Sequence, residues 1–189
     1  MKAGFDILYN NIPRAFVNSV VLLDVGLVQI LRKGIISDLV LCFACSCATY
    51  PKTDEDAARL VQYRLAYQQG LQDLVDSGAY ETDNFTVVNQ LFFVNTTLPY
   101  VEGKDDVIDY SFFAIDRFHI SQKGQAVAGL SLWNSMFEPV GNKSTSVQWT
   151  NGNILCPTED SPYLFTHRNS NTTYYLPERK LLADYVKKD

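Results

Sequence analysis

Two neighbouring stretches decide the fold: TDEDAARLVQYRLAYQQGLQDLVDSG at residues 53–78 and FTVVNQLFFV at residues 85–94. In the first stretch, Thr53 can cap a helix with Asp56 three residues later, and Gly78 suits the C-terminal end. Its apolar residues recur at steps of three and four and predict one buried face: Leu60, Tyr63, Tyr67, Leu71 and Leu74. The second stretch is rich in β-branched and aromatic residues, as strands are. Because a long one-sided helix needs a sheet to lie on, the pair predicts an α/β fold.

Weaker patterns predict four further elements. Residues 1–11 predict a short amphipathic helix, residues 17–23 a buried strand of the parallel-sheet type, and residues 25–32 a short helix. A last helix is expected from Ser121, a good N-cap, to Phe137. Its apolar positions are Val127, Leu130, Trp133 and Phe137.

The composition limits the class of protein. The chain has 189 residues, 47% of them apolar, and a net charge of −5 from 16 basic and 21 acidic residues. This suits one globular domain and argues against a nucleic-acid surface. No stretch reaches the ~20 apolar residues of a membrane span. Residues 39–47 fit no element, and two strands fall short of the roughly five of a usual sheet. We therefore expect further strands upstream of Met1.

Asn-x-Ser/Thr sequons point to the secretory pathway. The four candidate glycosylation sites are Asn84, Asn95, Asn142 and Asn171. The alternative is coincidence in a chain rich in Asn and Thr. Residues 1–11 do not resemble a secretory signal peptide, which has a basic start and an apolar core. We expect an extracellular or cell-surface protein whose true N-terminus lies upstream.

The four cysteines are candidates for disulfides, because an even number fits an oxidising compartment. They are Cys42, Cys45, Cys47 and Cys156, and three full pairings are possible. A zinc cluster is a less favoured alternative, since structural zinc sites commonly use two separated pairs of ligands. A redox-active Cys45 and Cys47 is less favoured still.

Asp116 and His119 are the candidate catalytic residues. A histidine held by a carboxylate is the usual general base for activating a hydroxyl, and Asp116 lies three residues before His119. The alternative is that Asp116 only caps a turn and His119 is merely packed near a helix start. His167 has no adjacent carboxylate and is expected to be a surface-loop residue.

A nucleophile to accompany this pair is not evident. The chain has no Gly-x-Ser-x-Gly elbow and no Gly-rich phosphate loop.

Several motifs, taken together and in order, resemble the phospholipase B group of the GDSL (SGNH hydrolase) lipases. The main ones are DRFHISQKG at 116–124 and LWNSMFEPVG at 132–141. Further stretches with the resemblance are PRAFVN at 13–18, CSC at 45–47, YQ at 67–68, CP at 156–157, SPYL at 161–164 and RN at 168–169. The resemblance extends from about residue 5 to residue 170.

The resemblance implies a three-layer α/β/α sandwich with a flavodoxin-like parallel sheet. It implies hydrolysis of phospholipid and other lipid esters at a membrane surface, with His119 as general base and Asp116 orienting it. It also implies that no metal or organic cofactor is needed. The family's nucleophilic Ser and its oxyanion-hole residues belong to blocks expected before Met1. Residues 1–141 would thus be the C-terminal part of the domain, and 142–189 a turn-rich trailing segment. The chain alone is therefore expected to be inactive.

This sequence departs from the family at two positions. Arg117 stands where relatives often have Cys, which would leave a cysteine such as Cys156 without its usual partner, and Gln125 stands where they have His. The alternative function is a non-catalytic product that binds lipid or a partner protein through apolar faces at residues 20–23 and 85–94. The oligomeric state cannot be predicted.

Overall fold

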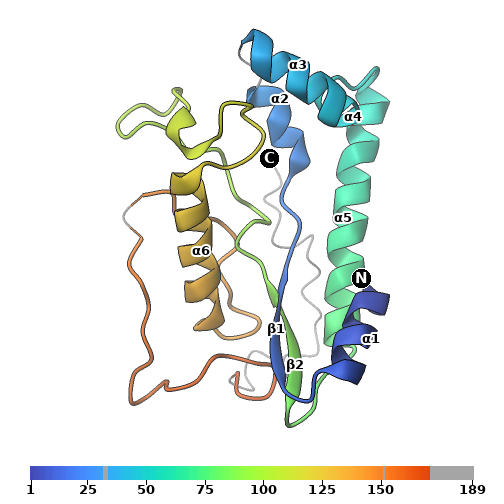
Figure 1. Ribbon diagram of the computed structural model, residues 1–189, viewed down its shortest axis with the longest axis vertical. Helices are drawn as coiled ribbons and strands as arrows, with labels where there is room; N and C mark the ends of the chain where they lie inside the picture. Colours follow the sequence, from blue (N-terminus) through green and yellow to red (C-terminus); the bar gives the residue numbers. More distant parts are fainter. Residues whose placement is uncertain (32–33, 151, 171–189) are drawn as a thin grey trace.

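The computed structural model describes residues 1–31, 34–150 and 152–170 (Figure 1). Its elements in chain order are α1 (Lys2–Asn11), β1 (Ala15–Val20), η1 (Val25–Leu27), α2 (Val28–Leu31), α3 (Ile35–Ala44), α4 (Ser46–Thr49), α5 (Asp54–Asp76), β2 (Phe85–Gln90), η2 (Tyr110–Phe112) and α6 (Gln122–Met136). The α/β class is confirmed. The unassigned residues 39–47 fold as the end of α3 and the start of α4.

The two strands form a parallel pair, as the sequence predicts. Ala15 pairs with Phe85 at one end and Val20 with Gln90 at the other. Helices α5 and α6 lie on opposite sides of this sheet (Figure 1). All six residues of β2 are buried, so the expectation that residues 85–94 offer an exposed apolar face is wrong. The exposed apolar residues near β1 are Val20, Leu22 and Leu23.

The core lies between the sheet, α5 and α1. Its buried residues are Val21, Leu71, Val75, Tyr80, Phe85, Val87, Leu91 and Val94. Helix α1 closes one end of this core, because Phe5 and Leu8 pack against it and Tyr80 donates a 2.6 Å hydrogen bond to Asp6. The short helix predicted at residues 1–11 is thereby a structural part of the domain.

Helix α5 has the predicted ends and part of the predicted buried face: Leu71 is buried, and Leu60 and Leu74 are partly buried and pack against core clusters. Thr53 accepts a hydrogen bond from the Asp56 N–H, and Gly78 takes the left-handed conformation that favours glycine. The buried residues of the helix are Arg64, Gln68, Leu71 and Val75. Tyr63 and Tyr67 are instead 59% and 63% exposed. Polar side chains are buried in their place and contact the segment after β1: Gln68 donates to the Leu22 carbonyl, and Arg64 pairs with Asp24.

Helix α6 begins where the sequence predicts and lies close against the loop before it. The Ser121 hydroxyl accepts from the Gly124 N–H and donates to the Ser111 carbonyl. A Cβ atom at Gly124 would lie 2.5 Å from the Phe112 carbonyl oxygen and 2.9 Å from the Ile120 Cβ. The absence of a side chain at Gly124 therefore lets the loop meet the helix. Of the four expected apolar positions none is fully buried; Gly124 and Ser135 are.

The segment after Gly141 has no helix or strand among residues 142–150 and 152–170, in agreement with its turn-rich sequence. It nevertheless packs onto the rest of the chain. Trp149 donates to the Thr97 carbonyl, Trp133 donates to the Leu155 carbonyl, and the Phe165 N–H donates to the Met136 carbonyl. The division at residue 141 remains a prediction.

Lys143 is a buried lysine at the C-terminal end of α6. Its Nζ donates to the carbonyls of Ser135 and Glu138 at 2.5 and 2.9 Å. Burial lowers the pKa of Lys143 to about 8, although the nearby Glu138 acts in the opposite direction. The buried cation opposes folding below that pH, while its hydrogen bonds cap the helix.

We expect Gly124→Ala to lower the free energy of unfolding by about 1–3 kcal/mol, because the new Cβ overlaps backbone that cannot easily move. Gly129 is the matched control, since it is exposed on the same helix and a Cβ there meets nothing within 4 Å. Gly129→Ala should raise stability by about 0.5–1 kcal/mol. Urea unfolding followed by circular dichroism measures both; equal effects would contradict this packing.

Lys143 should make stability rise with pH above about 8. Its pKa is lower in the folded than in the unfolded chain, so between about 8 and 10.5 the unfolded chain binds more protons. Relative to Lys143→Met, the wild type should therefore gain about 1–3 kcal/mol from pH 7.5 to pH 10. Urea unfolding of both proteins across this range tests it. A difference that stays constant would show that the amine is not perturbed.

Candidate active site

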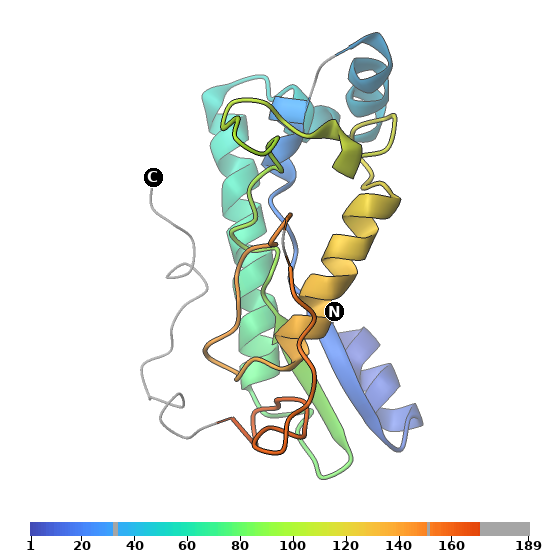
Figure 2. The same ribbon diagram turned by 90° about the vertical axis from the view of Figure 1, so that its left-hand side faces the viewer.

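Asp116 and His119 lie in a short closed loop between η2 and α6. Phe113 and Ile120 form an antiparallel bridge that closes the loop. Inside it, the Ala114 N–H donates to the His119 carbonyl at 2.8 Å. The loop lies at the end of the molecule toward which β1 and β2 run (Figures 1 and 2). Ligands of open parallel sheets bind at this carboxyl end of the strands.

The Asp116 carboxylate uses its two oxygens for different tasks. Oδ1 accepts from the backbone N–H groups of Phe118 and His119, both at 3.0 Å. Oδ2 is 2.7 Å from His119 Nδ1. Asp116 therefore caps the turn and also contacts the imidazole, and its catalytic role remains a prediction.

Arg117 gives the turn its shape. Its φ is 55°, in the left-handed region that a non-glycine residue rarely adopts. Its guanidinium lies over the Tyr110 ring, 4.1 Å from the centroid, in a cation–π contact. Nothing in the sequence indicates this conformation, since neither Gly nor Asn stands at the position. Backbone strain of this kind is concentrated at functional sites.

The electrostatics keep Asp116 ionised. Partial burial alone would raise the pKa of Asp116, but the hydrogen bonds from the His119 ring and from the Phe118 and His119 N–H groups outweigh it and lower that pKa. An ionised carboxylate on Nδ1 fixes the tautomer in which Nε2 can accept a proton. The geometry therefore suits His119 to general-base chemistry.

The His119 ring is open to its surroundings. Its side chain is 71% exposed, and the Phe118 ring contacts it edge to face at 5.0 Å. Phe118 in turn packs against the buried cluster of Val28, Leu41 and Ala48. In the part of the chain that the structure describes, no hydroxyl or thiol is hydrogen-bonded to the His119 ring. The loop is therefore anchored to the core through Phe118, while the His119 ring faces outward.

The four cysteines carry free thiols, with no disulfide among them, so their pairing stays a prediction. Cys42, Cys47 and Cys156 are exposed. Burial raises the pKa of the Cys45 thiol, and Cys47 adds to the rise, which makes Cys45 a poor nucleophile. Across the described ranges, no three His, Cys, Asp or Glu side chains gather as metal ligands, and no helix is long and apolar enough to cross a membrane.

The sequons differ in accessibility. Asn84 and Asn142 are exposed, whereas Asn95 is half-buried and its amide donates to the Thr145 hydroxyl at 3.2 Å. Asn171 lies outside the described residues. Glycosylation at all four positions remains a prediction.

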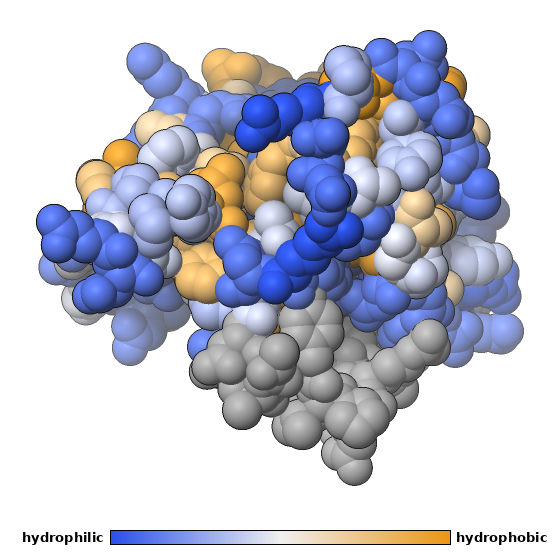
Figure 3. Space-filling model, turned by 90° about the horizontal axis from the view of Figure 1, so that it is seen from below, coloured by the Kyte–Doolittle hydropathy of each residue, from blue (hydrophilic) through white to orange (hydrophobic). Residues whose placement is uncertain are grey.

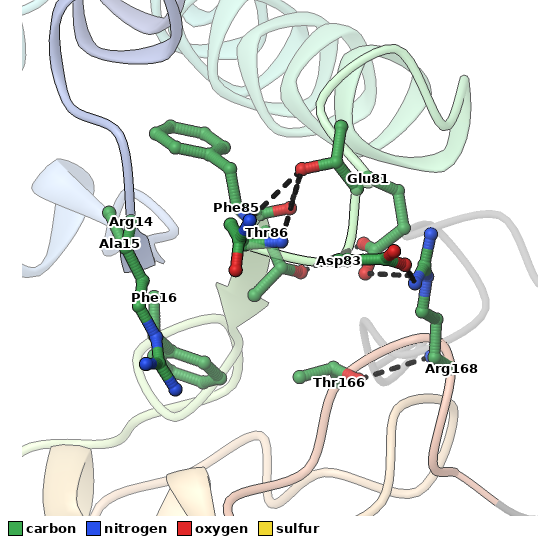
Figure 4. A pocket seen from close by; sticks show the side chains of 11 residues that line it. Arg14, Ala15, Phe16, Glu81, Asp83, Phe85, Thr86, Thr166 and Arg168 are labelled. Carbon is green, nitrogen blue, oxygen red and sulfur yellow. Dashed lines mark hydrogen bonds and ion pairs between the residues drawn. The ribbon is translucent and has the colours of Figure 1, made fainter.

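A separate pocket, which sequence reasoning missed, lies at the amino end of the strands (Figure 4). Arg14 and Phe16 line one side, and Arg168 forms ion pairs with Asp83 and Glu81 on the other. The described part of this end of the molecule is largely hydrophilic, with apolar patches between (Figure 3). Because parallel sheets bind ligands at the opposite edge, this pocket is a poor candidate for the active site. His167, near it in sequence, is half-buried rather than exposed.

Comparison with known proteins identifies relatives of the chain. No model of a protein family and no solved structure matches it. "Phospholipase B1, membrane-associated" of Homo sapiens is 37% identical over 173 residues, covering 88% of this chain and 12% of the relative. The proteins of the same name from Mus musculus and Rattus norvegicus are 37% and 36% identical over 177 residues, covering 90% of this chain and 12% of each relative.

The chain spans only 12% of the length of the curated relatives it matches, yet most of its own residues take part in the match. Asp116, His119 and the helix that follows them belong to the stretch whose motifs resemble the phospholipase B group. Over most of its length, this chain is therefore related to phospholipase B1.

Proposed function

We propose that this chain forms part of a serine-dependent lipid-ester hydrolase and contributes its general base, His119, and the orienting residue, Asp116. The observation that carries the proposal is the 2.7 Å contact between His119 Nδ1 and Asp116 Oδ2 beside an exposed imidazole. The relationship to phospholipase B1 supports lipid esters, with phospholipids and lysophospholipids first, as the substrate class.

In the proposed mechanism, His119 Nε2 takes the proton from a serine hydroxyl supplied by a segment outside these residues. The serine oxygen attacks the ester carbonyl, and the imidazolium then gives its proton to the departing alcohol. Water repeats the sequence and releases the fatty acid. Asp116 stabilises the imidazolium throughout, because its carboxylate remains ionised. No metal or organic cofactor takes part.

The proposal extends to the architecture. An incomplete three-layer sandwich of the SGNH-hydrolase type would place α5 and α6 on the two faces of a larger parallel sheet. Among the described residues β1 pairs only with β2, so its other edge is open to a further strand. Such strands would also bring the nucleophile and the oxyanion donors to the carboxyl edge, where His119 lies.

A second candidate is a non-catalytic product that binds a lipid or a partner protein. The exposure of Val20, Leu22 and Leu23 beside the open edge of β1 favours it.

We further propose an extracellular or cell-surface location. The sequons support it, and the name of the relatives, membrane-associated, agrees with it.

The isolated chain of residues 1–189 should hydrolyse neither p-nitrophenyl butyrate nor lysophosphatidylcholine above the rate in buffer, because a base without a nucleophile and an oxyanion hole forms no acyl-enzyme. Release of nitrophenol and of fatty acid measures this. Turnover that disappears in His119→Ala would contradict it.

A fusion should reveal the role of the pair. We would join residues 1–189 to the stretch of the human relative that directly precedes the matched region, so that the missing parts are supplied. His119→Ala should lower kcat by roughly 10³-fold or more, and Asp116→Asn by about 10²–10⁴-fold with little change in KM. His167→Gln, at the only other histidine, is the control and should leave kcat within about twofold. An active fusion that tolerates His119→Ala would refute the assignment.

A further inference from the structure

Helix α3 presents four of its large apolar side chains outward. Ile35, Ile36, Leu39 and Phe43 are 88%, 59%, 59% and 83% exposed, and Cys42 between them is exposed as well. At 100° per residue these five positions share one side of the helix. The buried residues, Ser37 and Leu41, lie on the opposite side. Solvated helices normally show the reverse pattern, so the outer stripe is suited to an apolar surface.

The inner side of α3 rests on the candidate active site. Leu41 is fully buried in the cluster against which Phe118 packs, and Phe118 precedes His119. Ile115, directly before Asp116, is 81% exposed. Both views of the ribbon place α3 and the loop before α6 at the same end of the molecule (Figures 1 and 2). The outer stripe therefore belongs to the same end as the exposed imidazole.

The size and charge of the stripe limit what can cover it. A stable contact with a second copy usually takes about 20–30 residues a side, whereas the stripe offers five. None of the five carries a charge, and a net charge of −5 disfavours an anionic membrane. A short uncharged apolar helix side of this kind matches the acyl and headgroup boundary of a zwitterionic bilayer.

We propose that the outer stripe of α3 (Ile35, Ile36, Leu39, Cys42 and Phe43) docks on a zwitterionic phospholipid surface and holds the loop of Asp116 and His119 against it. The proposal deepens the proposed function and rests on it, since it assigns the surface from which the lipid ester enters. The helix lies in the interface and does not cross the bilayer.

Flotation of residues 1–189 with phosphatidylcholine vesicles tests the docking directly. Leu39→Ser/Phe43→Ser should lower the vesicle partition coefficient at least about tenfold, because two apolar side chains no longer leave water. Tyr63→Ser/Tyr67→Ser is the matched control, an exposed pair with the same spacing on α5, and it should bind as the wild type does. Far-UV circular dichroism checks that each variant folds.

A second readout uses the native thiols. Phosphatidylcholine vesicles should slow maleimide labelling of Cys42, on the stripe, and leave that of exposed Cys156 unchanged, as read by peptide mass spectrometry. A wild type that does not float, equal binding of both double variants, or a dimer that Leu39→Ser/Phe43→Ser makes monomeric without loss of flotation would each overturn the proposal.

Failure of the docking proposal can be distinguished from failure of the proposed hydrolase function. Flotation needs no turnover, so His119→Ala should float like the wild type even if the proposed function is wrong. In the fusion with the human relative, Leu39→Ser/Phe43→Ser should slow hydrolysis of vesicle phosphatidylcholine but not of dissolved p-nitrophenyl butyrate. Equal loss on both substrates would refute a role in docking.

Discussion

The burial of β2 along its whole length is the constraint on which the rest of the structure depends. Three of its six residues are polar, and each must find a hydrogen-bond partner inside the protein. Thr86 donates to Glu81, Asn89 to Gln72 of α5, and Gln90 to Asn18 of β1. The Ser135 hydroxyl of α6 donates in turn to the side-chain amide oxygen Oε1 of Gln90 at 2.6 Å. These bonds join the strand to its neighbour and to the helices on both sides.

The polar partners also explain what the sequence could and could not predict. Helix ends follow local rules, so Thr53, Gly78 and Ser121 marked them correctly. The exposure of Tyr63 and Tyr67 on α5 does not follow from local rules, because Gln68 is buried to donate to the Leu22 carbonyl just after β1, and apolar periodicity does not record such a bond. The outward apolar stripe of α3 was missed for a related reason, since apolar residues are expected to point inward.

The candidate site was predictable to a similar degree. Asp116 and His119 were found because their spacing fits a turn in which a carboxylate reaches an imidazole. The left-handed backbone of Arg117 and its stacking on Tyr110 could not be found, because they depend on contacts with another segment. Gly124 belongs to the same group, since its need for close packing appears only once the loop is seen against α6. The spacing of the two candidate residues can therefore be recognised in the sequence, whereas the contacts that support them depend on the tertiary structure.

If Asn84 carries the predicted glycan, the burial of Thr86 sets an order of events in biosynthesis. Asn84 and Thr86 form one sequon, and the asparagine stays exposed after folding while the threonine hydroxyl lies inside, bonded to Glu81. A transferase that reads both side chains can reach them only before β2 pairs with β1. A glycan at Asn84 would thus show that the nascent chain was glycosylated before it folded. A chain that folded without this glycan could not receive it afterwards.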